Sequence, residues 1–95
     1  MAEHVEEVFS DKDITSSATT VVKSGPGLLR SITVTKVGTT WQAKAYDNTA
    51  ASGTVLINEL DLNAEATYTF DFAFGTGLTI VTSGGTAGEI VVSYA

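Results

Sequence analysis

The stretch Thr67–Phe74, TYTFDFAF, alternates aromatic side chains with small or polar ones along its whole length. Because successive side chains of a β-strand point to opposite faces, this alternation places every aromatic ring on one face. We expect that face to lie in the core, since a domain of 95 residues needs its large apolar side chains inside. An exposed stacking platform for sugars or bases is the alternative. The aromatic residues are Tyr68, Phe70, Phe72 and Phe74.

Shorter runs of the same kind flank this stretch, and turn-forming residues separate them. The strongest turn is Ser24-Gly25-Pro26-Gly27, because proline presets φ and glycine permits a positive φ. After this turn, Leu28, Ile32 and Val34 share one phase of a strand. The predicted strands span residues 18–23, 28–37, 41–46, 54–58, 67–74, 78–82 and 89–94.

Trp41, the only tryptophan, begins the third of these strands and shares its phase with Ala43 and Ala45. A large apolar ring on an alternating strand is typical of a core position or a subunit interface. A platform for a ligand is the alternative, and it would need Trp41 or Tyr46 exposed in a groove.

The composition indicates an all-β domain. Thr occurs 15 times, Val 10 times and Ile 5 times, and such β-branched side chains pack well on a pleated sheet. Seven to eight short antiparallel strands with regular turns predict a small β-sandwich or a small barrel, of jelly-roll-like or immunoglobulin-like type. We place this domain at residues 14–95 and an acid-rich N-terminal arm at residues 1–13.

The arm carries the residues that we expect to contact a partner. Val5, Val8 and Phe9 have the spacing of one face of a short helix, whereas Val5, Glu7 and Phe9 alternate as in a strand, and both alternatives stay open. Apolar anchors next to acidic side chains suit a contact with a basic surface. The candidate interface residues are Val5, Glu6, Val8 and Phe9.

The net charge is −6, and the charge is unevenly distributed. Residues 1–46 hold five acidic and five basic side chains, whereas residues 47–95 hold six acidic side chains and no basic one. An acidic surface repels phosphate backbones and anionic lipids, so we expect neither nucleic acid nor membranes as partners. The acidity serves solubility or, alternatively, docking of a basic partner. The acidic start, MAEHVEEVFS, lacks the features of a secretion signal, so we expect the chain to stay where it is made.

Few residues are suited to catalysis or metal binding. Without Cys, there is no disulfide, thiolate metal site or Cys nucleophile, and the one histidine, His4, lies near the terminus. No nucleotide-binding glycine motif is present. We therefore expect no enzymatic activity, catalytic residue, metal or cofactor.

Three local patterns have a second interpretation. Asp47-Asn48-Thr49 resembles part of a calcium loop but lacks the later ligands, so a turn is favoured. Glu59, Asp61 and Glu65 resemble the paired carboxylates of a glycosidase, but we expect them in a solvated connection without a pocket. Finally, Gly75-Thr76-Gly77 and Gly84-Gly85 precede no helix, so turns are favoured over phosphate cradles.

Three stretches together resemble a group of small accessory proteins of tailed-phage virions. They are VVKSGPGLLRSITV (21–34), AYDNTAASGTVL (45–56) and TFDFAFGTGLTIVTSGGTAGEIVVSY (69–94). The resemblance implies a β-sandwich or jelly-roll protein without enzymatic activity, commonly a homotrimer. It further implies a capsid decoration (cement) protein that is made in the host cytoplasm, binds the phage major capsid protein and stabilises the capsid surface of the virion. A tail, neck or fibre component and a carbohydrate-binding module are the alternatives.

Overall fold

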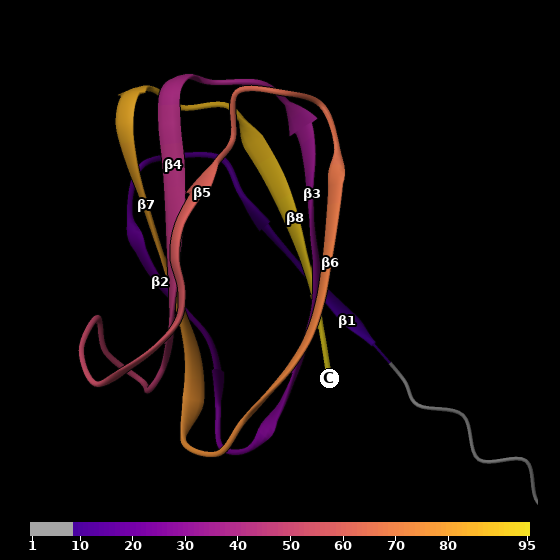
Figure 1. Ribbon diagram of the computed structural model, residues 1–95, viewed down its shortest axis with the longest axis vertical. Helices are drawn as coiled ribbons and strands as arrows, with labels where there is room; N and C mark the ends of the chain where they lie inside the picture. The colour runs from indigo at the N-terminus through magenta and orange to yellow at the C-terminus, as the bar shows by residue number, and fades with distance from the viewer. Residues whose placement is uncertain (1–8) are drawn as a thin grey trace, which may run out of the picture.

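Two four-stranded antiparallel sheets face each other in the computed structural model, which describes residues 9–95 (Figure 1). The all-β prediction is confirmed, and each of the seven predicted strands is present. An eighth strand precedes them, beginning at Ser10. The strands are β1 (Ser10–Ile14), β2 (Thr19–Ser24), β3 (Gly27–Lys36), β4 (Thr39–Asp47), β5 (Thr54–Asp61), β6 (Thr67–Phe74), β7 (Gly77–Thr86) and β8 (Glu89–Tyr94).

The strand order is that of a jelly roll. One sheet has the order β1-β8-β3-β6 and the other β2-β7-β4-β5, so consecutive strands mostly alternate between the sheets. The connections β1–β2, β3–β4, β5–β6 and β7–β8 all lie at one end of the sandwich, the upper end in Figure 1. We call this the upper end. The first strand belongs to the sandwich, so the boundary predicted at residue 14 falls on the last residue of β1.

A single apolar core fills the space between the sheets. Trp41, Ala43 and Ala45 are all buried, as their shared phase predicts. Pairing continues to the end of the described chain, where the N–H and C=O groups of Ala95 bond to the C=O and N–H groups of Leu28. The buried apolar residues are Ile14, Leu29, Ile32, Val34, Trp41, Ala43, Ala45, Ile57, Leu62, Phe74, Leu78, Ile80, Ile90 and Val92.

The predicted phase of β3 is wrong in its first part. Leu29, and not Leu28, is fully buried together with Ile32. The register of β3 against β8 shifts between Leu29 and Ser31, so Arg30 is an extra residue in a β-bulge. Because a bulge of one residue reverses the alternation, the strand changes phase there.

The aromatic row of β6 is likewise interrupted. Phe74 is buried, while Tyr68 and Phe70 pack against the core and remain partly exposed. Phe72 is 39% exposed, which corrects the prediction of one continuous core face. Two causes are visible: β6 is an edge strand, and its pairing with β3 contains a bulge at Asp71, whose φ is 55°.

Candidate functional site

Phe9, the first described residue, contacts the sandwich. The guanidinium of Arg30 lies over its ring, with Cζ 4.7 Å from the ring centroid. A cation over an aromatic face within about 6 Å is attracted by the ring quadrupole. Arg30, the extra residue of the bulge in β3, therefore makes a cation–π contact with Phe9, the residue directly before β1. The other three candidate interface residues, Val5, Glu6 and Val8, lie outside the described residues, as does His4.

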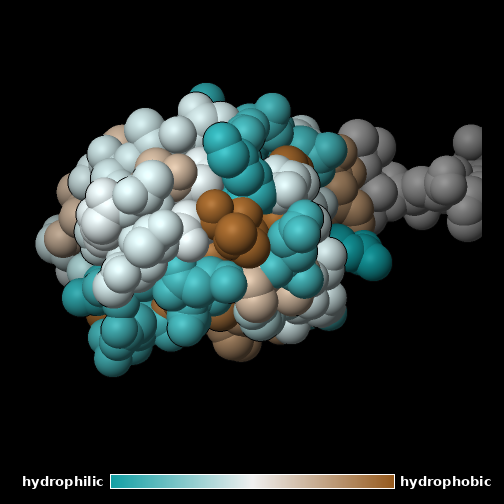
Figure 2. All heavy atoms as spheres, turned by 90° about the horizontal axis from the view of Figure 1, so that it is seen from above, coloured by the Kyte–Doolittle hydropathy of each residue, from teal (hydrophilic) through white to brown (hydrophobic). Residues whose placement is uncertain are grey.

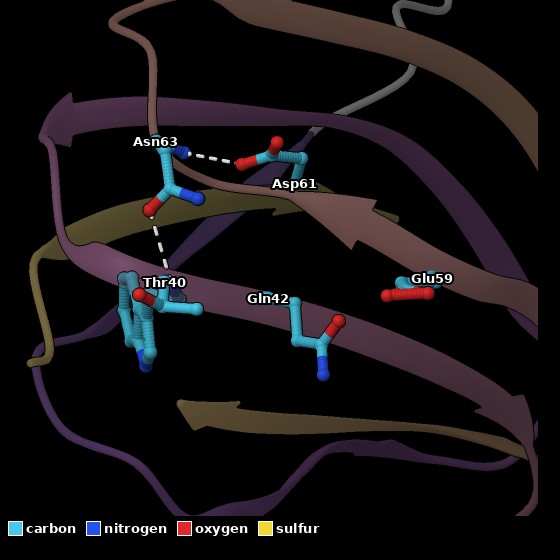
Figure 3. Close-up of a pocket in the computed structure, with 6 residues that line it drawn as sticks. Thr40, Gln42, Glu59, Asp61 and Asn63 are labelled. Atoms are coloured by element: carbon cyan, nitrogen blue, oxygen red, sulfur yellow. Dashed lines mark hydrogen bonds between the residues drawn. The ribbon is translucent and has the colours of Figure 1, made fainter. Parts of the chain in front are cut away.

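A shallow pocket of about 380 Å³ lies beside β4 and β5 (Figure 3). The carboxylates of Glu59 and Asp61 come from β5, and the amide of Asn63 comes from the segment that follows it. The side-chain Oδ1 of Asn63 accepts a hydrogen bond from the backbone N–H of Trp41 at 3.0 Å, and the backbone N–H of Asn63 donates to Asp61 Oδ1 at 2.9 Å. The lining residues are Thr40, Trp41, Gln42, Glu59, Asp61 and Asn63.

This pocket corrects the prediction that Glu59 and Asp61 lie in a connection without a pocket. The strand continues through Asp61 because the next residue, Leu62, is fully buried and its N–H donates to the Trp41 C=O. Both carboxylates are exposed. They therefore lack the apolar enclosure that a glycosidase gives its general acid.

A second polar arrangement joins the end of β4 to the turn that precedes β7. Asp47, at the end of β4, accepts hydrogen bonds from the N–H groups of Gly75, Thr76 and Gly77 at 2.8–3.3 Å. Gly75 and Thr76 form the turn between β6 and β7, and Gly77 begins β7, nearly 30 residues away from Asp47 in the chain. The turn interpretation of Gly75-Thr76-Gly77 is confirmed, and its N–H groups bind a carboxylate of the protein itself.

The Asp47-Asn48-Thr49 stretch is also a turn, as predicted. Asn48 Oδ1 accepts a hydrogen bond from the Thr49 N–H, and its Nδ2 donates to the Ser52 C=O at 3.0 Å. The hydroxyl of Thr79 donates to the Asn48 C=O, which fixes the loop on β7. The side-chain amide of Asn48 thus bonds to the backbone of this loop, as Asn side chains commonly do in turns.

Hydrogen bonds lower the pKa of Asp47 below its usual value of 3.8, chiefly that from the Gly75 N–H and then that from the Thr76 N–H. The carboxylate therefore stabilises the fold above its ordinary pKa, and this stabilisation is lost as the pH falls through its lowered pKa. We expect the melting temperature of the parent to exceed that of Asp47→Asn at neutral pH. This difference in melting temperature should disappear as the pH falls from about 5 to about 2. Thermal melts across this range, with Asp11→Asn on exposed β1 as control, test this; a gap of constant size contradicts it.

Trp41 is fully buried, and its Nε1–H donates to Ser17 Oγ at 3.1 Å. It borders the pocket without exposing its ring, so the indole offers no platform for a sugar. Tyr46 is partly exposed on β4. The core interpretation of Trp41 is thus confirmed.

The upper end of the sandwich exposes an apolar patch within hydrophilic surroundings (Figure 2). Val37, in the turn between β3 and β4 at this end, is 44% exposed. Single exposed valines are common on protein surfaces, and this one assigns no ligand.

A scan against protein-family models and searches of curated proteins and of solved structures gave no significant match. Residues 9–95 contain no helix that could span a membrane. Within the same range, no three His, Cys, Asp or Glu side chains come together in a way that could hold a metal ion.

Proposed function

We propose that this chain is a non-enzymatic structural protein of a tailed-phage virion. In this role it is a decoration (cement) subunit, which binds the outer capsid shell as a homotrimer and stabilises it. The observation that carries the proposal is the combination of a jelly-roll sandwich and a residue, Phe9, anchored at the point where residues 1–8 join the edge strand β1. Jelly rolls are common in viral capsid proteins. Support also comes from the three stretches that resemble phage accessory proteins.

The sandwich suits a protein that acts by rigid binding. No buried side-chain nitrogen or oxygen among the described residues lacks a hydrogen-bond partner. The carboxylate of Asp47 accepts hydrogen bonds from the turn between β6 and β7, so this turn is fixed to the end of β4. A rigid body loses little conformational freedom on binding, which favours attachment to a preformed shell.

Symmetry multiplies a weak contact. A trimer on a local three-fold axis of a capsid presents three equal contacts at once, and the effective concentration of the second and third contacts raises the total affinity by a factor of about 10²–10⁴. Because such a protein binds the assembled shell and not its separated subunits, mass action stabilises the shell.

The proposed contact with the capsid is the N-terminal arm, residues 1–13, with Val5, Glu6, Val8 and Phe9 as interface residues. Deleting residues 2–8 tests this contact. The deletion must stop before Ser10, because β1 pairs with β8 over its whole length and its loss would expose the edge of β8. We expect the shortened protein to keep its melting temperature and its oligomeric state, and to lose binding to expanded, empty shells of the phage major capsid protein. Cosedimentation measures the binding, and Val5→Ser/Val8→Ser is the matched point variant.

Unchanged binding of both variants contradicts the assignment of residues 1–8. Failure of the full-length protein to bind shells, with density on tails in electron micrographs of virions, would move the protein to the tail.

A further inference from the structure

The jelly-roll order separates the two halves of the chain onto opposite sides of the sandwich. In one sheet the edge strands are β1 and β6, and in the other they are β2 and β5. Short connections join β1 to β2 and β5 to β6, so each pair of edges bounds one side. Figure 1 looks onto the side bounded by β5 and β6, which are edge strands of different sheets. We call the line between these two edge strands the seam. We call these sides the β1–β2 side and the β5–β6 side.

The uneven charge of the sequence thereby becomes a difference between two surfaces. The β5–β6 side carries Glu59, Asp61, Glu65 and Asp71, and its strands and their connection contain no Lys or Arg. The β1–β2 side carries two lysines, Lys12 and Lys23, and two acids in β1, Asp11 and Asp13. The β5–β6 side is thus strongly acidic, whereas the β1–β2 side has no net charge and carries two lysines.

The acidic side also exposes an aromatic ring. Phe72 is opposite the fully buried Leu29 in the sheet register, so its side chain lies on the inward face of the edge strand, beside the seam. Its ring contacts that of Phe70, with centroids 5.5 Å apart, and it stays 39% exposed. Lys12 has the corresponding place on the other side: it is opposite the fully buried Val92 on the edge strand β1, and it is exposed.

The edge of β6 is unsuited to the addition of another strand. The bulge at Asp71, with its φ of 55°, interrupts the alternation of the edge N–H and C=O groups. Bulges and charges on edge strands are the usual means by which proteins prevent continuous pairing. An occupant of the β5–β6 side must therefore bind through side chains, with cations near the carboxylates and apolar area over Phe72.

The β1–β2 side of a second copy of the chain supplies the cations, because it carries Lys12 and Lys23. Two β5–β6 sides placed together would bring four carboxylates against the same four, and like charges in contact strongly disfavour a complex. We infer that the β5–β6 side of one copy docks against the β1–β2 side of the next, head to tail. Lys12 and Lys23 of the second copy then face Glu59, Asp61 and Asp71 of the first.

A head-to-tail contact either closes into a ring or grows into a filament. Closure with three copies gives the homotrimer. The number of copies rests on the proposed function, whereas the two contact surfaces follow from the charges of the two sides.

Charge reversal tests the contact. We expect the purified parent to sediment as a trimer at low ionic strength and to dissociate more readily at high ionic strength, because exposed ion pairs are screened. Lys12→Glu/Lys23→Glu should sediment as a monomer under conditions in which the parent is a trimer. Adding Glu59→Lys and Asp61→Lys to the same chain should restore the trimer, because the two introduced glutamates then face two introduced lysines. Lys36→Glu, which makes the same reversal at one position on β3, is the control and should remain trimeric.

A second variant tests the apolar part without any change of charge. Phe72→Ser should raise the protein concentration needed for assembly by about tenfold. Val37→Ser removes a comparably exposed apolar side chain at the upper end and should leave assembly unchanged. Melting curves of each variant identify any that fail to fold.

The outcomes separate this inference from the proposed function. A monomeric parent that still binds capsid shells overturns the head-to-tail contact and leaves the proposed function standing. A trimer that is insensitive to both the double charge reversal and Phe72→Ser also overturns the inference, as does failure of the fourfold reversal to restore assembly. A trimer that behaves as expected but ignores shells supports the inference and contradicts the proposed function. Binding of a basic partner by a monomeric parent would assign the acidic side to that partner instead.

Discussion

Replacing Gly84 with alanine should lower the free energy of unfolding by about 3–5 kcal/mol, which is among the larger effects of single substitutions. The φ of Gly84 is 140°, a region that residues with a side chain rarely adopt. A methyl group at this position would overlap the carbonyl oxygen of Thr40, which belongs to the backbone of β4 and cannot rotate away. Since β4 and β7 pair over much of their length, relief of this overlap requires one strand to move and the ladder to open locally.

Gly75→Ala is the matched control, because a methyl group there meets nothing within 4 Å and the φ of Gly75 is not positive. This control should change the free energy of unfolding by no more than about 1 kcal/mol, with a gain as the expected direction, because alanine restricts the unfolded chain. Urea denaturation of both variants provides the comparison. Equal stabilities of the two variants would mean that β4 and β7 do not approach each other as closely as the structure has them.

The close approach at Gly84 also explains why the sequence pattern underestimates β7. Gly84 and Gly85 predict a turn after residue 82, because glycines between apolar runs usually mark one. In the fold the strand continues to Thr86, and glycine is needed at position 84 because Thr40, with a φ of 52°, brings its carbonyl group against it. A pair of glycines in the sequence fits a turn as well as a close contact between two backbones. The position of the neighbouring strand, here β4, decides between these two possibilities.

Alternation predicts the buried residues of β4 correctly and those in the first part of β3 wrongly. The phase of Trp41, Ala43 and Ala45 is correct because their strand keeps its register with β7 throughout. The phase of Leu28 is wrong because Arg30 is bulged against β8. Bulges depend on how two distant strands match, so the local sequence carries little signal for them.

The sequence does contain a pattern that predicts the continuation of β5 along the pocket. Glu59, Leu60, Asp61 and Leu62 alternate polar and apolar side chains, which is the pattern of a strand and not of a solvated connection. The hydrogen bonds of Asp47, in contrast, join residues about 30 positions apart, and nothing in either stretch alone predicts them.

Trp41→Ala should be the second strongly destabilising substitution, with a loss of about 3–5 kcal/mol in the free energy of unfolding. The indole is the largest fully buried side chain and lies near the upper end, where Leu62 is also fully buried. Its removal leaves a cavity that the rigid ladders on both sides of β4 cannot close. For a chain of 95 residues, whose total stability is expected at roughly 5–15 kcal/mol, this loss is a large fraction.

The hydrogen bond of the indole can be measured separately from its packing. Ser17→Ala removes the acceptor of the Nε1–H and should cost about 1–2 kcal/mol, because a partly buried donor then has no protein partner. In the background of Trp41→Phe, which has no such donor, Ser17→Ala should cost close to nothing. A double-mutant cycle from urea denaturation therefore yields a coupling of about 1–2 kcal/mol between the two side chains. A coupling of zero would mean that the connection between β1 and β2 is not held to the core through Ser17, and that the upper end depends on apolar packing alone.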